Sequence, residues 1–244
     1  MNKTYEFIDK ALYIKKDGIL VFGDLHLGYW YSLKQSGNDI PKIQFKETMK
    51  EIKIILDHIK KDNKKLNKII FLGDIKHFFS YQKIEKNLSL ELLNFLEKYL
   101  KKEDIIIIKG NHETTNLIGD KKLVNYYIKN NIAFIHGDKE FKQIFDKKIK
   151  LIIMGHLHPA ISLTDSQKIK HEKYKCFLEG RYKGKEVVIL PSFIPNVEGS
   201  AVNEYLGNSH CIIPAKTLMK FKVYAIGKNK IYDFGILKQL IKKS

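Results

Sequence analysis

Short apolar runs divide the chain, and each of them is followed, at once or after one lysine, by a glycine or by a polar residue that can bind a metal. Five such runs cover residues 19–22, 69–72, 105–108, 132–135 and 151–154. Their length and polar flanks favour buried strands over pieces of buried helix. Because ligands of α/β sheets bind outside the carboxyl ends of the strands, we expect the residues after these runs to form one site.

Between the runs, apolar residues return at helical spacing. They predict amphipathic helices over residues 42–61 and around residues 88–100, and a short helix over residues 123–128. Residues 29–42 contain several helix breakers, so an irregular stretch is expected there.

Hairpins are expected at the beginning of the chain and in its second half. The first turns at Asp17 and Gly18, between two apolar runs. Later strand-like runs cover residues 174–178, 187–190 and 220–226. No linker or change in composition separates the helical half from the hairpin half. The pattern predicts one α/β domain over residues 1–244, with mixed sheets covered by helices.

The composition indicates a reduced intracellular compartment. The chain has 244 residues and two cysteines without framework spacing. The first ten residues are polar where a signal peptide needs an apolar core, and no run is long enough to cross a membrane. We therefore expect a cytoplasmic protein; its protein partners and oligomeric state are left open.

The net charge of +17 has two interpretations. It can mark a partner that carries phosphate, such as a nucleic acid. However, Arg181 is the single arginine among 44 basic residues, and the lysines are spread over the whole chain. Such lysine runs are usually solvated faces, which favours a compositional habit as the main cause.

The residues after the five runs share the chemistry of metal ligands. They are Asp24, His26, Asp74, Asn111, His136, His156 and His158. Oxygen and imidazole donors together suit Mn, Fe or Zn better than calcium. Seven donors exceed the needs of one ion that keeps room for substrate, so they divide naturally between two ions, and a carboxylate such as Asp74 can bridge them. Two ions about 3.5–4 Å apart are a known arrangement for displacement at phosphorus.

Taken singly, each motif has a simpler structural interpretation. Gly-Asp after a strand is usually a turn, and a buried histidine is usually a hydrogen-bonded core residue. Five motifs in order, each at the end of a predicted strand, favour the metal site instead.

These motifs resemble those of the calcineurin-like metallophosphoesterases. The resemblance is carried by Asp24-Leu25-His26, Gly73-Asp74, Gly110-Asn111-His112-Glu113, His136-Gly137-Asp138 and Gly155-His156-Leu157-His158. A finer resemblance is to the archaeal and bacterial ICC-like phosphoesterases, whose bacterial members are often called DNA-ligase-associated. Its segments are residues 24–29, Gly37 with Ile40 and Pro41, and residues 73–77, 155–160 and 190–193.

The resemblance implies a four-layer α/β/β/α sandwich with two divalent ions. Manganese comes first among the candidates, with Zn, Fe, Ni or Mg as alternatives. The first ion would be held by Asp24, His26, Asp74 and His158. The second would be held by Asp74, Asn111, His136 and His156. Asp74 thus bridges the ions, and His112 is implied as the acid that protonates the leaving oxygen.

One position departs from the wider superfamily. Many members carry a carboxylate three residues after the bridging aspartate, where it orients the catalytic histidine, and here that position is His77. Two neighbouring imidazoles repel each other when both are protonated, so the doubly charged state is unfavourable. The orienting partner of His112 is therefore open, with Glu113 as one alternative. His77 could contact substrate or simply cap the helix that follows.

Two other residues are candidates for substrate contacts. Trp30 lies in the aromatic run 29–31 and could stack on a nucleobase, although packing is the commoner role. Arg181 could bind a phosphate from a predicted hairpin, although an exposed cation is the simpler interpretation.

The sequence predicts an enzyme that hydrolyses phosphodiesters with two metal ions. The substrates implied by the resemblance are nucleotides, such as 2′,3′-cyclic nucleotides, or nucleic-acid ends. A phosphomonoesterase is the alternative within the same class. The alternative from another class is a non-enzymatic scaffold that binds metal or nucleic acid, because a fold does not determine function.

Overall fold

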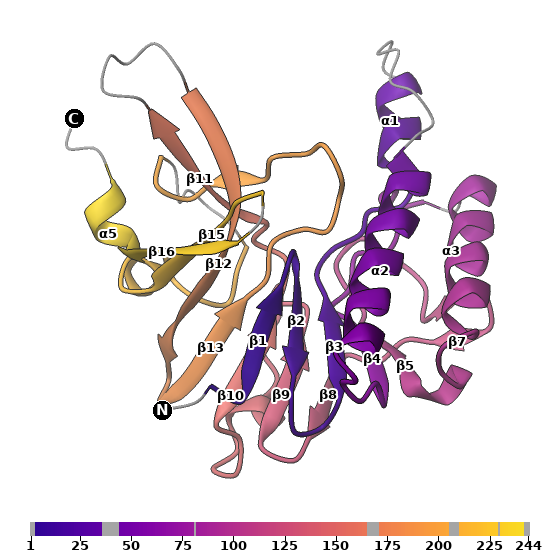
Figure 1. Ribbon diagram of the computed structural model, residues 1–244, viewed down its shortest axis with the longest axis horizontal. Helices are drawn as coiled ribbons and strands as arrows, with labels where there is room; N and C mark the ends of the chain where they lie inside the picture. The colour runs from indigo at the N-terminus through magenta and orange to yellow at the C-terminus, as the bar shows by residue number, and fades with distance from the viewer. Residues whose placement is uncertain are drawn as a thin grey trace. The chain divides into compact units, whose positions relative to one another are not determined.

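The computed structural model describes residues 3–35, 44–80, 82–164, 171–204, 210–228 and 230–241. It divides into two compact units, each built on its own sheet (Figure 1). Unit 1 comprises Met1–Asn125 and Phe193–Asn196, and unit 2 comprises Tyr126–Ser192 and Val197–Ser244. The expectation of one domain over residues 1–244 stays a prediction, because this division concerns contacts and not independent folding.

Unit 1 is built on a five-stranded mixed sheet whose strands follow one another in chain order. The strands are β1 (Tyr5–Ile8), β2 (Ala11–Ile14), β3 (Ile19–Phe22), β4 (Lys68–Phe71) and β5 (Ile105–Ile107). The β2–β3 hairpin turns at Gly18, whose φ is 62°. The expected hairpin is therefore confirmed. β3, β4 and β5 are parallel, so their carboxyl ends lie at the same edge.

Two amphipathic helices connect the parallel strands of unit 1. They are α2 (Gln44–Lys61) and α3 (Lys83–Leu96). Their apolar faces, with Ile52 and Leu92 among them, pack in one core with Phe22 and Phe71 of the sheet. Both helices follow from the apolar spacing of the sequence. A 3₁₀ turn at Lys102–Asp104 and a small hairpin of β6 (Leu117–Ile118) and β7 (Lys121–Lys122) complete the unit.

The expected irregular stretch begins instead as a helix, α1 (Tyr29–Gln35). The N–H groups of Tyr31 and Ser32 donate to the carbonyl of Gly28, at 2.9 and 3.1 Å, and start the helix. The breakers that suggested a loop, Gly37, Asn38 and Pro41, lie outside the described residues.

Unit 2 is built on a nine-stranded mixed sheet. Its strands are β8 (Tyr126–Lys129), β9 (Ile132–Ile135), β10 (Leu151–Met154), β11 (Pro159–Thr164), β12 (His171–Tyr182), β13 (Lys185–Ile189), β14 (Ser200–Ala201), β15 (Lys222–Ile226) and β16 (Ile231–Ile236). β9, β10 and β13 are parallel neighbours. A 3₁₀ turn, Lys142–Phe145, and two short helices, α4 (Ala215–Leu218) and α5 (Leu237–Leu240), accompany the sheet.

The expected helix over residues 123–128 is wrong. Half of that segment, residues 126–128, belongs to β8, which pairs antiparallel with β9. Asn130 has a φ of 55°, the left-handed conformation that asparagine tolerates in turns. The sequence carries a turn signal at Asn130 and Asn131, but the spacing of the apolar residues before it favoured a helix.

The predicted α/β class with mixed sheets is confirmed, since each unit combines parallel and antiparallel pairs with helices. Among the described residues, no helix has the length and apolar character required to cross a membrane.

Candidate active site

The site of unit 1 lies at the carboxyl ends of its three parallel strands. Asp24 follows β3, Asp74 follows β4, and Asn111 and His112 follow β5. The carbonyl of Asp74 accepts N–H groups from Leu25 at 3.2 Å and His26 at 2.9 Å, which ties the first two strand ends together. The carbonyl of Asp24 accepts the N–H of Phe193 at 2.7 Å.

Four predicted ligands have left-handed backbone conformations. The φ angles are 44° at His26 and 46° at Asp74 in unit 1, and 67° at His156 and 48° at His158 in unit 2. Such a conformation costs about 1–3 kcal/mol for a residue other than glycine and is concentrated at functional sites. The strand ends therefore fold sharply at the positions where the sequence predicts metal ligands.

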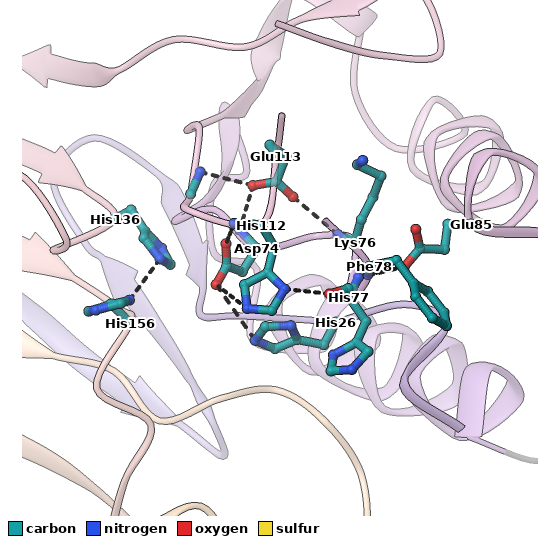
Figure 2. A network of polar contacts seen from close by, with 11 residues as sticks. His26, Asp74, Lys76, His77, Phe78, Glu85, His112, Glu113, His136 and His156 are labelled. Atoms are coloured by element: carbon teal, nitrogen blue, oxygen red, sulfur yellow. Dashed lines mark hydrogen bonds and ion pairs between the residues drawn. The ribbon is translucent and has the colours of Figure 1, made fainter. Parts of the chain in front are cut away.

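The Asp74 carboxylate is the centre of the polar contacts in unit 1 (Figure 2). Its Oδ1 accepts the N–H of His112 at 3.0 Å. Its Oδ2 lies 3.7 Å from Nε2 of His26 and 3.9 Å from Nε2 of His112. A Cβ at Gly110 would lie 2.1 Å from Oδ1, so only glycine leaves room for the carboxylate.

Glu113 lies beside Asp74 and joins the ends of β4 and β5. It is 2% exposed and accepts the N–H groups of Asp74 at 3.0 Å, Lys76 at 3.1 Å and Gly110 at 2.9 Å. Bonds to N–H groups stabilise the ionised carboxylate. Glu113 thus fixes the main chain of the site.

The orienting partner of the His112 ring is a main-chain group. Nδ1 of His112 donates to the carbonyl oxygen of His77 (Figure 2). A carbonyl only accepts hydrogen bonds, so Nδ1 carries a proton and Nε2 faces the Asp74 side. Phe79, which is 57% exposed, stacks on the ring with 4.1 Å between centroids.

The His77 side chain lies beside the rings of His26, Tyr29 and His112. Burial, and then the neighbouring His112, lowers the pKa of His77, so the ring favours its neutral form. The alternative that His77 caps the next helix is wrong, since α3 begins at Lys83 with Gln82 as its N-cap.

The structure adds Glu85, which the sequence argument did not single out. Glu85 is fully buried in α3, and its Oε1 accepts N–H groups from His77 at 2.6 Å and Phe78 at 2.8 Å. The available signal was its position, because Glu85 lies one turn before Ser89 on the apolar face that continues to Leu92 and Leu96. A carboxylate on the buried face of a helix points to a partner outside that helix.

In unit 2 the predicted ligands lie at the ends of two neighbouring parallel strands. His136 follows β9, and His156 and His158 follow β10, with Ile135 paired to Met154. Nδ1 of His156 lies 3.1 Å from Nε2 of His136 (Figure 2). Two imidazole nitrogens at this distance can share a proton or direct their lone pairs towards one cation.

Two predicted substrate contacts, Trp30 and Arg181, differ in their burial. The Trp30 side chain is 4% exposed in α1, which supports the packing alternative over stacking on a nucleobase. Arg181 is exposed on β12, and its partner Glu186 pairs with Leu151 at the start of β10. Arg181 therefore lies at the edge of the unit 2 sheet opposite to His156.

The donors present fit divalent transition ions. Unit 1 supplies carboxylates, one imidazole and one amide, which are Asp24, Asp74, His26 and Asn111. Unit 2 supplies three imidazoles, His136, His156 and His158. Mixed oxygen and nitrogen ligands suit Mn, Fe, Zn or Ni, and the strained ligand positions and the space left by Gly110 agree with a built metal site.

A model of the family "calcineurin-like phosphoesterase" matches residues 18–221, which include all seven predicted ligands. The chain belongs to this family. The calcineurin-like phosphoesterases are metal-dependent, so this chain is a metal-dependent phosphoesterase, and the resemblance seen in its motifs is confirmed. Comparison with curated proteins gives no match.

Three of the solved structures that match this chain come from different organisms. The nuclease MPE of Pseudomonas putida is 18% identical, with a TM-score of 0.59, over 94% of this chain and 100% of that chain. Wild-type Vps29 of Entamoeba histolytica with Zn²⁺ is 13% identical, with a TM-score of 0.38, over 88% and 96%. A metallophosphoesterase of Sphaerobacter thermophilus is 11% identical, with a TM-score of 0.31, over 85% and 82%. At 18% identity and a TM-score of 0.59, the first of these matches shows a shared fold.

Proposed function

We propose that this calcineurin-like phosphoesterase hydrolyses phosphodiester bonds of nucleotides, such as 2′,3′-cyclic nucleotides, or of nucleic-acid ends. Two divalent ions, with manganese as the first candidate, would be held by the seven ligands predicted from the sequence. Bound there, the ions supply Lewis acidity towards the phosphoryl oxygens and lower the pKa of water. This set of ligands is the one that the family resemblance implies.

The observation that carries the proposal is the placement of His112. Its Nε2 lies 3.9 Å from Oδ2 of Asp74, while its Nδ1 is held by the carbonyl of His77. An imidazole fixed in this way can donate a proton from Nε2 and keep the one on Nδ1. A proton is needed when the leaving group is an alkoxide such as a ribose oxygen, and such general acid catalysis contributes ~10²–10⁴-fold.

A nucleotide substrate is supported by the aromatic ring beside this acid. Phe79 stacks on His112 with 23° between the ring planes and is 57% exposed. Exposed aromatic rings stack on bases of any sequence, at about 1–3 kcal/mol per base. The activity of the nuclease MPE, which shares the fold, also agrees with a phosphodiester substrate.

A substrate panel with metal-stripped protein tests the proposal. Mn, Zn, Ni or Mg would be added back, and hydrolysis of cyclic nucleotides, linear dinucleotides, phosphomonoesters and DNA ends would be followed. We expect hydrolysis of diesters that depends on Mn or a similar transition ion. Hydrolysis of monoesters alone would make the protein a phosphomonoesterase. No hydrolysis of any ester with every metal would favour the scaffold.

A further inference from the structure

We propose that Glu85 positions the His112 ring through the peptide group that joins His77 and Phe78. The inference rests on the proposed function, since it concerns the general acid step. Glu85 lies in the first turn of α3 and is completely buried, at 0% exposure. Its Oε1 accepts the Phe78 N–H at 2.8 Å and the His77 N–H at 2.6 Å.

The peptide group between His77 and Phe78 is hydrogen-bonded at both ends. Its N–H, which belongs to Phe78, donates to the Glu85 carboxylate. Its carbonyl, which belongs to His77, accepts Nδ1–H of His112 (Figure 2). A carboxylate on the N–H polarises the amide towards its oxygen, and hydrogen bonds in a chain strengthen one another. The carbonyl thus becomes a stronger acceptor for the imidazole.

The loop after β3 packs against the same carboxylate. A Cβ at Gly28, whose φ is 95°, would lie 2.8 Å from Cγ and 2.9 Å from Oε1 of Glu85. The carbonyl of Leu27 also accepts the His77 N–H, at 3.2 Å. These contacts hold the Glu85 carboxylate in one position. The carboxylate in turn holds the peptide group that orients His112.

A role limited to the helix does not explain these contacts. Glu85 bonds to residues 77 and 78, which precede the helix and its N-cap Gln82. Burying a carboxylate is costly unless it is hydrogen-bonded. Two N–H groups offset part of this cost here, both of them next to the carbonyl that holds the His112 ring.

The first test compares Glu85→Ala and Glu85→Gln with the parent on two substrates. One is a nucleotide ester, whose alkoxide needs a proton to leave, and the other is a nitrophenyl ester, whose leaving group does not. We expect Glu85→Ala to lower kcat on the nucleotide ester by about 10–100-fold, the usual effect of removing a supporting hydrogen bond. The loss on the nitrophenyl ester should be much smaller. Glu85→Gln keeps an acceptor oxygen and should recover part of the activity.

Ser89→Ala is the matched control. Ser89 lies one turn further along the same buried face, and its Oγ donates to the main-chain carbonyl of Glu85 at 2.7 Å. The control removes a buried hydrogen bond from α3 without touching the carboxylate. It should show no dependence on the leaving group. A dependence equal to that of Glu85→Ala would overturn the proposal, because any defect in α3 would then suffice.

A double-mutant cycle supplies the decisive comparison. If Glu85 acts through His112, Glu85→Ala should cost nothing further on the nucleotide ester once His112→Asn is present. The same loss in both backgrounds would overturn the role of Glu85 and leave His112 as the acid. Equal losses of the His112→Asn single variant on both esters would instead overturn the general acid, and the Glu85 proposal with it.

Discussion

The residue with the most specific proposed role is His112, and hydrogen bonds hold both its main chain and its ring. Its N–H donates to Asp74, and its ring is held by the His77 carbonyl. These contacts place the imidazole beside the Asp74 carboxylate, and His112 is not one of the seven proposed ligands.

His112→Asn should leave metal content nearly unchanged and lower turnover. We expect a loss of ~10²–10⁴-fold on a nucleotide ester and much less on a nitrophenyl ester, because only the alkoxide needs the proton. The ratio of turnover between variant and parent, measured on both esters at saturating metal, gives the answer. Loss of one metal would make His112 a ligand and require a new division of the donors.

Gly110→Ala tests the space in which the Asp74 carboxylate lies. The added Cβ would meet Oδ1 at 2.1 Å and the main-chain nitrogen of Asp74 at 2.6 Å, so the carboxylate has to move. We expect metal affinity to fall about 10–100-fold, as for other changes in the support of ligands. Equilibrium dialysis against Mn²⁺ measures it, and unchanged affinity would show that Asp74 is not placed as described.

Glu85→Gln should change the pH dependence of stability. Burial raises the pKa of Glu85 above its ordinary 4.5, while its two N–H bonds lower it. With a raised pKa, the folded parent keeps the proton longer than the unfolded chain. The parent therefore loses stability as pH rises from the ordinary value to the raised one.

The glutamine variant has no such titration, so its stability relative to the parent should increase over that pH interval. Urea unfolding at several pH values measures the difference. A difference independent of pH would contradict the raised pKa. A variant that is as stable as the parent at neutral pH would also show that lost turnover is not lost folding.

At the scale of elements, the strand ends were predictable and their supports were not. The five apolar runs and the glycines after them identified the ends of β3, β4, β5, β9 and β10. The carbonyl of His77 was not predictable, and Glu85 gave only the weak signal of its position on the apolar face of α3. Hydrogen bonds to main-chain groups leave no residue type to recognise, and a glutamate within an amphipathic helix usually faces solvent.

The two wrong elements share a physical cause. α1 and β8 are short segments whose conformation depends on neighbouring turns, at Gly28 and Asn130. A pattern of apolar residues is too short there to separate a helix from a strand or a loop.

Asp74 follows β4, the central one of the three parallel strands, and contacts the ends of both neighbouring strands. Its carbonyl bonds to the loop after β3, and its carboxylate to the loop after β5. Asp74→Asn should therefore lose more metal than His136→Asn or any other single histidine replacement, because Asp74 is the ligand proposed for both ions. Metal analysis of the purified variants decides this. Two tightly bound ions and normal turnover in Asp74→Asn would contradict the bridging role.

At the scale of the whole molecule, the family model spans residues of both units. Unit 1 contains the two predicted carboxylate ligands and His112, and unit 2 contains His136, His156 and His158. The lysines behind the charge of +17 are spread throughout the chain, and the single arginine lies opposite the unit 2 histidines.

A metal titration tests the central claim most directly. Protein stripped of metal would be titrated with Mn²⁺ while bound metal and hydrolysis of a nucleotide phosphodiester are followed together. We predict no hydrolysis without metal, and full hydrolysis only when a second ion binds to each chain. Full hydrolysis with one ion bound, or without any, would contradict it.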